Sequence, residues 1–164
     1  MTRSTMPETA FASSEREHFH TINAELDLLK RSGPLLRILE RVPVPVAVMN
    51  SCRQMVFVNN ALLTLLSQEE HDSIIGLRIG EAFGCPNSTH DLGGCGTTEW
   101  CEGCGVTAAV VEALETGEAR HRSEINAQSS GGRVNLAFDQ TAYAFDYEGT
   151  RFVVVFMTPR LNTH

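Results

Sequence analysis

Four cysteines in one short stretch are the residues of this chain most suited to chemistry. Cys85, Cys95, Cys101 and Cys104 are separated by nine, five and two residues, whereas the fifth cysteine, Cys52, stands alone. Cysteines that only fill a core would be scattered, and clustered thiolates are the usual ligands of zinc and of iron–sulfur clusters. The spacing therefore predicts one metal centre held by the four clustered sulfurs, with Cys52 as a small buried side chain.

Glycines surround these cysteines where the backbone must turn tightly. Cys101 and Cys104 form a Cys-x-x-Cys pair followed by Gly105, and the two intervening residues let both sulfurs point at one ion. Glycine after the second cysteine permits the turn that this arrangement needs. Cys95 is bracketed by three further glycines, which let the backbone approach a metal closely: Gly93, Gly94 and Gly96.

Four thiolates around one metal carry a net negative charge that the protein must compensate. Arg78 is the nearest cation in the sequence, so backbone N–H groups are expected to supply most of the compensation. A helix predicted to begin near Val106 would add the positive end of its dipole beside Cys104.

The ligand type alone leaves several centres open. Four cysteines would complete the closed tetrahedron of zinc, and equally a 2Fe–2S or 4Fe–4S cluster, and a thiol–disulfide switch without metal is a further alternative. His90 lies between Cys85 and Cys95 and is either an exposed loop residue or an additional ligand. A Cys-x-x-Cys pair also occurs in thiol oxidoreductases, but a strand precedes it there and a glycine-rich loop precedes it here. The sequence has no other catalytic motif, so we predict that the chain is not an enzyme.

The N-terminal segment is predicted to be a tail followed by a helix. Residues 1–12 lack periodicity and are expected to be disordered. A helix is expected from Ser14, which has capping-box spacing with Glu17, and residues 13–33 carry a narrow apolar stripe. The stripe consists of Phe19, Ile22, Leu26 and Leu29. It packs either on the chain's own core or on a second copy, and its narrowness favours a dimerisation helix.

The remaining segments place two strands before several short helices and three strands after them. The predicted elements are a helix at 35–42, strands at 46–49 and 54–58, a helix at 61–66, another beginning at 67–70, the cysteine loop at 84–105, a helix at 106–114, and strands at 119–126, 134–145 and 152–157, before a short tail at 160–164. Strands grouped apart from helices are typical of an α+β fold with an antiparallel sheet.

This order of segments resembles a PAS domain over residues 34–159. The resemblance rests on LLRILERVPVPVAVMN followed by QMVFVNNA, on SIIGLRIGEAFG, and on VVEALETGE leading into strands that end in FVVVFMTP. The phrase GCGTTEWCEGCG, from Gly94 to Gly105, is similar to the GCGTTEFCxxCG of a subset of bacterial PAS sensors. The resemblance implies a five-stranded antiparallel sheet with short helices on one face, preceded by the N-terminal helix.

The resemblance also implies a function in signal sensing. It favours an iron–sulfur cluster over zinc at Cys85, Cys95, Cys101 and Cys104, with redox state, oxygen or nitric oxide as the signal. No kinase, cyclase or DNA-binding segment follows the PAS-like region in the sequence. The expected partners are therefore a second copy of the chain, in a homodimer, and a separate kinase or regulator.

Charge and hydropathy limit the possible environments. The 164 residues carry a formal net charge of −7, whereas a nucleic-acid or anionic membrane surface needs a basic face. No apolar run approaches the roughly 18 residues that span a bilayer, and the N-terminus lacks the apolar core of a signal peptide. These features predict a cytoplasmic protein, where thiols stay reduced and are available to bind metal.

Overall fold

Five antiparallel strands form one sheet in the computed structural model, which describes residues 9–68, 71–90 and 92–160. The strand order is β2-β1-β5-β4-β3. The strands are β1 (Val46–Asn50), β2 (Met55–Val58), β3 (Glu118–Ser129), β4 (Gly132–Tyr147) and β5 (Thr150–Pro159). Because β5 pairs with both β1 and β4, it joins the two halves of the chain in one sheet.

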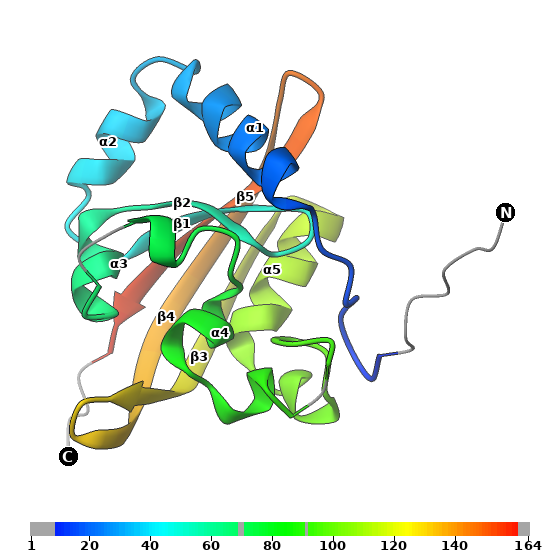
Figure 1. Cartoon of the computed structure of the whole chain (residues 1–164), viewed down its shortest axis with the longest axis vertical. Helices are drawn as coiled ribbons and strands as arrows, with labels where there is room; N and C mark the ends of the chain where they lie inside the picture. The colour runs from blue at the N-terminus through cyan, green and yellow to red at the C-terminus, as the bar shows by residue number, and fades with distance from the viewer. Residues whose placement is uncertain (1–8, 69–70, 91, 161–164) are drawn as a thin grey trace, which may run out of the picture.

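Helices cover both faces of this sheet (Figure 1). They are α1 (Phe19–Lys30), α2 (Leu35–Arg41), α3 (Asn60–Leu65), α4 (Ile79–Phe83) and α5 (Gly105–Thr116), with short 3-10 turns at His71–Ser73, Pro86–Ser88 and Glu99–Cys101. Helices α1 and α2 lie on one side of the sheet, and α4 and α5 lie on the other. The predicted α+β fold with a five-stranded antiparallel sheet is confirmed.

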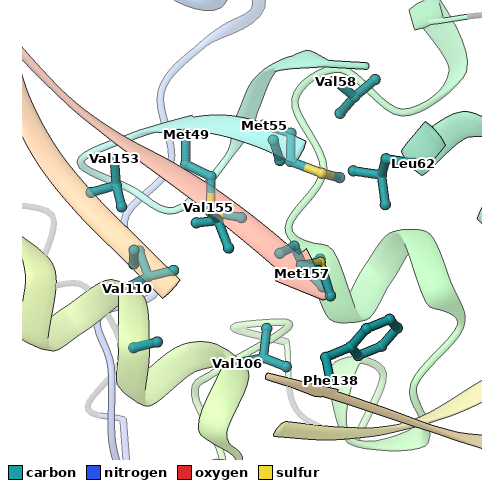
Figure 2. Packing of buried hydrophobic residues seen from close by; sticks show 14 of the residues in the cluster. Met49, Met55, Val58, Leu62, Val106, Val110, Phe138, Val153, Val155 and Met157 are labelled. Atoms are coloured by element: carbon teal, nitrogen blue, oxygen red, sulfur yellow. The ribbon is translucent and has the colours of Figure 1, made fainter. Parts of the chain in front are cut away.

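The alternation of side chains along β1 divides the core into two layers. Ala47 and Met49 face the layer that contains α3, α4 and α5, whereas Val46 and Val48 face the layer of α1 and α2. Figure 2 shows the first layer, where Met49 lies among methionine, valine and phenylalanine side chains from the other strands and from α5. All five residues of β1 are at most 1% exposed, so the strand is buried on both faces.

The helix α1 begins later than its capping pattern predicts. The expected start at Ser14 is wrong, because the helix starts at Phe19 after His18. The backbone before it is already engaged elsewhere, since the Arg78 guanidinium donates to Glu15 O at 2.7 Å and Glu17 N–H donates to Gln54 Oε1 at 2.8 Å. Tertiary hydrogen bonds therefore replace the local capping box.

The apolar stripe of α1 packs mainly on the chain's own sheet. Ile22 and Leu29 are buried in the layer that includes Val48 and Phe57, whereas Phe19 is 71% exposed. The residues just before the helix also differ from the predicted tail, because Ala12 is buried and donates its N–H to Gly96 O. Three parts of these predictions lie outside the described residues: residues 1–8 of the predicted tail, residues 69 and 70 of the segment at 67–70, and residues 161–164.

Candidate metal centre

The structure brings the four clustered cysteines around one cavity. Cys85, Cys95, Cys101 and Cys104 all line it, together with residues of α4, α5 and β3. Its unfilled space, including the open mouth, is about 360 Å³. All five cysteines of the chain are free thiols, and Cys52 is buried in the β1–β2 turn, as predicted. Among the described residues, no three Cys, His, Asp or Glu side chains are arranged to hold a single metal ion.

The glycine Gly80 lets two of these cysteines approach α4. A Cβ atom at Gly80 would lie 2.8 Å from Cys95 Sγ and 3.5 Å from Cys85 Cβ. Cys85 follows the C-cap of α4, and its N–H donates to Gly80 O at 2.8 Å. Gly94 and Gly96, on either side of Cys95, have φ values of 82° and 87°, which L side chains rarely adopt. The backbone therefore turns at both positions in a way that requires glycine.

The other two cysteines are fixed by the start of α5. Cys104 is the N-cap residue of this helix, and the nearby N–H groups of Thr107 and Val106 lower the pKa of its thiol against the larger effect of burial. The predicted placement of a helix N-terminus beside Cys104 is confirmed. Cys101 Sγ lies 3.1 Å from Thr98 Oγ1, and Cys101 O accepts the Cys104 N–H at 3.1 Å.

Burial disfavours the thiolate form of two of these cysteines, Cys95 and Cys104. Burial, with smaller contributions from the negative charges of Glu81 and Cys104, raises the pKa of Cys95 to about 11, although a backbone hydrogen bond from Gly80 and the charge of Arg53 oppose the shift. Burial also raises the pKa of Cys104, to which Cys101 and Cys85 add, although the α5 N–H groups oppose the shift. Cys104 therefore lies near enough to the other three cysteines for thiolates there to repel its own. A bound cation would reverse this balance, because it favours the thiolate form.

Two buried arginines adjoin Cys95. Arg78 is 1% exposed and donates to Gly93 O at 3.0 Å and to Cys95 O at 3.3 Å; Arg53 is 6% exposed and donates to Cys95 O at 2.9 Å. Burial, followed by the neighbouring charges of Arg53 and Arg16, lowers the pKa of Arg78 to about 10. Within the described parts of the chain, no carboxylate is at ion-pair distance from either buried arginine.

These cations fit an anionic centre. Four thiolates around a doubly charged metal or cluster core leave about two negative charges. Buried charges are costly unless they are compensated, and the guanidinium groups of Arg53 and Arg78 otherwise donate only to main-chain carbonyl oxygens. The sequence identified Arg78 as the nearest cation. It gave no signal for Arg53, which lies 42 positions before Cys95 and meets it only through the fold.

A partly buried carboxylate completes the surroundings of Cys95. Glu81 pairs with Arg16 and accepts N–H groups from Arg78 at 3.1 Å and from Cys95 at 3.2 Å. Burial alone would raise the pKa of Glu81, but the hydrogen bonds from Arg16, Arg78 and Cys95 hold it below its ordinary value. Glu81 therefore stays ionised and links the backbone N–H of Cys95 to that of Arg78.

Comparison with known proteins identifies the fold. No protein-family model matches the sequence, and no curated protein is similar to it. Solved structures do match. The PAS domain of an HTR-like protein from Haloarcula marismortui is 17% identical, with a TM-score of 0.52, over 84% of this chain and 98% of that one. The PAS domain of Bordetella pertussis BvgS is 14% identical, with a TM-score of 0.57, over 81% and 88%. A domain of a sensory box sensor histidine kinase/response regulator from Geobacter sulfurreducens is 14% identical, with a TM-score of 0.50, over 80% and 96%.

The chain has the fold of a PAS domain. The cysteine cavity lies at the edge of this PAS fold, between Gly80 of α4, Thr107 of α5 and Ile125 of β3. The space between the sheet and the helices is filled by side chains that include Met49 and Phe138 (Figure 2). In the described part of the PAS fold, no helix has the length and apolarity that crossing a membrane requires.

Two further residues of the PAS fold bear on the ligand set. His90 is exposed and lies edge-to-face against Trp100, with ring centroids 4.6 Å apart; it does not line the cysteine cavity. Glu124, on β3, does line the cavity. The sequence did not single out Glu124, because it is one of several carboxylates at exposed positions of the strands.

Proposed function

We propose that this PAS fold is a sensor module that binds an iron–sulfur cluster through Cys85, Cys95, Cys101 and Cys104. The signal is a change in redox state, oxygen or nitric oxide that alters the cluster. The observation that carries the proposal is the single cavity that all four sulfurs line, beside two buried cations that lack a carboxylate partner among the described residues.

Four cysteine ligands suit an iron–sulfur cluster as well as zinc. The resemblance of GCGTTEWCEGCG, from Gly94 to Gly105, to the loop of a subset of bacterial PAS sensors favours the cluster. The four cysteines of this loop border one cavity, as either centre requires.

The relatives in fold support a role in signalling. One of them is a domain of a sensor histidine kinase/response regulator. A PAS module of this kind passes its state to another chain, and we propose a homodimer and a separate kinase or regulator as the partners. The cysteine loop is the element that changes, because it holds the cluster and leads directly into α5.

Anaerobic purification tests the proposal. The protein is purified with and without air, and iron, zinc and acid-labile sulfide are measured per chain together with the visible absorption spectrum. A brown anaerobic protein that contains iron and sulfide and bleaches in air is the expected result. A colourless protein with one zinc per chain in both preparations would instead establish a zinc-stabilised interaction domain.

Matched cysteine variants locate the centre. Cys95→Ser and Cys104→Ser are expected to lose the cluster, because each removes one of four ligands, whereas Cys52→Ser keeps it. Cys52 is a suitable control because it is a buried free thiol outside the cavity. Iron retained in Cys95→Ser and Cys104→Ser would show that the cysteine cavity is not the binding site.

A further inference from the structure

The segment before α1 lies along the cysteine loop. Ala10 N–H donates to Thr97 O and Ala12 N–H donates to Gly96 O, both at 3.0 Å. Figure 1 shows this segment running from the start of α1 down one side of the molecule towards the loop. Residues 10–17 are named the strap here, because their backbone is attached to the loop at one end and continues into α1 at the other.

The two buried arginines bind the strap and the loop at the same time. Arg53 donates to Ser13 O at 3.0 Å and to Cys95 O at 2.9 Å. Arg78 donates to Glu15 O at 2.7 Å and to Gly93 O at 3.0 Å. Each guanidinium therefore links a carbonyl oxygen of the strap to a carbonyl oxygen of the cysteine loop.

A second bridge runs through a carboxylate. Glu81 pairs with Arg16 of the strap and accepts the N–H of Cys95. One residue further along, Glu17 N–H donates to Gln54 Oε1, and α1 begins at Phe19. The path from Cys95 to the first turn of α1 thus consists of direct hydrogen bonds and does not pass through the sheet.

We propose that the strap couples the cysteine centre to α1: it stays docked while the cysteine loop is held in place around the centre, and it is released when the loop rearranges. The proposal rests on the proposed function, because loss of the metal centre is what rearranges the loop. Arg53, Arg78 and Glu81 each hold the strap and the loop together, so a displaced loop removes one side of every bridge. Burial of the two cations then becomes costly, and exposing them to water requires the strap to leave.

The expected output is a change in α1. Release of residues 10–17 frees the backbone directly before Phe19, while Ile22 and Leu29 remain packed on the sheet. The strap gives a route from the cysteine loop to the start of α1 that passes through neither α5 nor the sheet.

Hydrogen–deuterium exchange on the full chain tests the proposal. Metal-loaded protein, prepared anaerobically, is compared with the same protein after chelation and oxidation, with metal content measured on each sample. Peptides covering residues 10–17 are expected to exchange at least about tenfold faster after metal removal, together with the loop, because their hydrogen bonds open. The β4–β5 hairpin should be unchanged. Faster exchange of the loop with an unchanged strap would overturn the inference and leave the metal site intact.

Variants of the strap test the coupling in the opposite direction. Ala12→Pro removes the N–H that binds Gly96 O, and Arg16→Gln removes the pair with Glu81. Because coupling is reciprocal, each should speed loss of the metal to a chelator by about three- to tenfold, the worth of one hydrogen bond. Two controls should not: Thr9→Pro, which introduces a proline just before the strap, and Arg151→Gln, which removes an arginine that pairs with Asp146 outside the strap.

The outcomes separate the two proposals. Iron or zinc bound normally, with chelation rates of Ala12→Pro and Arg16→Gln equal to those of the parent chain, would overturn the strap and spare the metal centre. A chain that binds neither metal in any preparation would overturn the metal centre and, with it, the metal dependence of the strap. In that case exchange in Ala12→Pro would still report whether the strap and the loop open together.

Discussion

At the residue scale, Gly80 sets how closely the ligand loop approaches α4. Its Cα faces Cys95 and Cys85, and no side chain separates them. The atom that an added Cβ would meet first, Cys95 Sγ, is the end of a small side chain, so it can rotate away at little cost to folding. Once rotated, however, Cys95 Sγ would no longer be in position to bind a metal together with the other three sulfurs.

Gly80→Ala is therefore expected to displace a ligand without unfolding the protein. Alanine favours helices by about 1 kcal/mol over glycine, so the thermal midpoint should not fall. The iron or zinc content per chain should fall several-fold, as measured by metal analysis. Gly103→Ala is the matched control, because nothing lies within 4 Å of a Cβ at Gly103. Full metal content in Gly80→Ala would show that Cys95 is not a ligand.

The sequence identified the cysteines of the candidate site but not the charges around them. Clustering of Cys85, Cys95, Cys101 and Cys104 is a local property of the chain, so it can be read without a structure. Arg53 reaches Cys95 because the β1–β2 turn packs against the loop, and Glu124 reaches the cavity because β3 runs beside it. Contacts of this kind depend on the tertiary fold.

At the scale of elements, Asn59 joins four segments. Its side-chain oxygen accepts the N–H groups of Val46 and Leu62, each at 3.0 Å, which ties β1 to the first turn of α3. Its amide nitrogen donates to the carbonyl oxygens of Leu39, Val42 and Val44. Asn59 is fully buried, so none of these groups can turn to water instead.

Asn59→Ala should consequently be strongly destabilising. It removes an N-cap and leaves several buried backbone groups without partners, which together are worth about 3 kcal/mol or more. Chemical denaturation would measure the loss in the free energy of unfolding. Asn60→Ala, at the next, exposed position, should change it by less than about 0.5 kcal/mol. Similar effects of the two substitutions would contradict the role given to Asn59.

Helix α1 also contains a buried carboxylate that makes its packing sensitive to pH. Burial raises the pKa of Glu25, while the hydrogen bond from Asn50 Nδ2, 3.1 Å from Glu25 Oε1, partly opposes the shift. Because the folded state binds the proton more tightly than the unfolded state, the contribution of Glu25 to stability is present below about pH 4.5 and is lost as the pH rises through its folded pKa.

Glu25→Gln is expected to raise the free energy of unfolding at pH 7. Glutamine keeps an oxygen that accepts from Asn50 but carries no charge to desolvate. The advantage over the parent chain should shrink as the pH falls towards 4, where Glu25 is itself neutral in both states. Denaturation at pH 4 and at pH 7 checks this, and an equal difference at both would mean that Glu25 does not titrate in this range.

The order of elements was predictable, whereas several boundaries were not. Continuous apolar runs identified strands such as β1 and β5, and weak alternation identified β3, because each strand buries at least one face. Strands β3 and β4 extend beyond the predicted 119–126 and 134–145, since they remain paired as far as Ser129 and Gly132. Pairing satisfies their backbone whether or not the side chains are apolar, so the apolar pattern underestimates their length.

At the scale of the whole molecule, the sheet separates a layer that contains the cysteine centre from a layer that contains α1. In the second layer, Ile22 and Leu29 are buried against the sheet. The large apolar side chains that stay exposed on the described helices of this layer are Phe19 and Ile38. A homodimer formed by α1 would therefore use the surface at Phe19, rather than the full stripe that the sequence suggested.

Phe19→Glu is expected to shift the chain from dimer to monomer. A charge at this position would be buried without a partner in the dimer, but it is exposed in the monomer. Sedimentation velocity measures the shift. Leu92→Glu is the control, since Leu92 is fully exposed in the cysteine loop, away from α1. A parent chain that sediments as a monomer at all concentrations would contradict the homodimer itself.

Gly105 gives the ligand loop two ends of different rigidity. A side chain there would overlap the carbonyl oxygen of Arg122, so the start of α5 is pressed directly onto the backbone of β3. Cys104, one residue earlier, is thereby anchored to the most extensively paired part of the sheet. The position of Cys95 depends instead on the strap and on the buried arginines Arg53 and Arg78. Substitutions that loosen the strap would therefore be felt at Cys95 before Cys104, because the sheet holds Cys104 independently of the N-terminal segment.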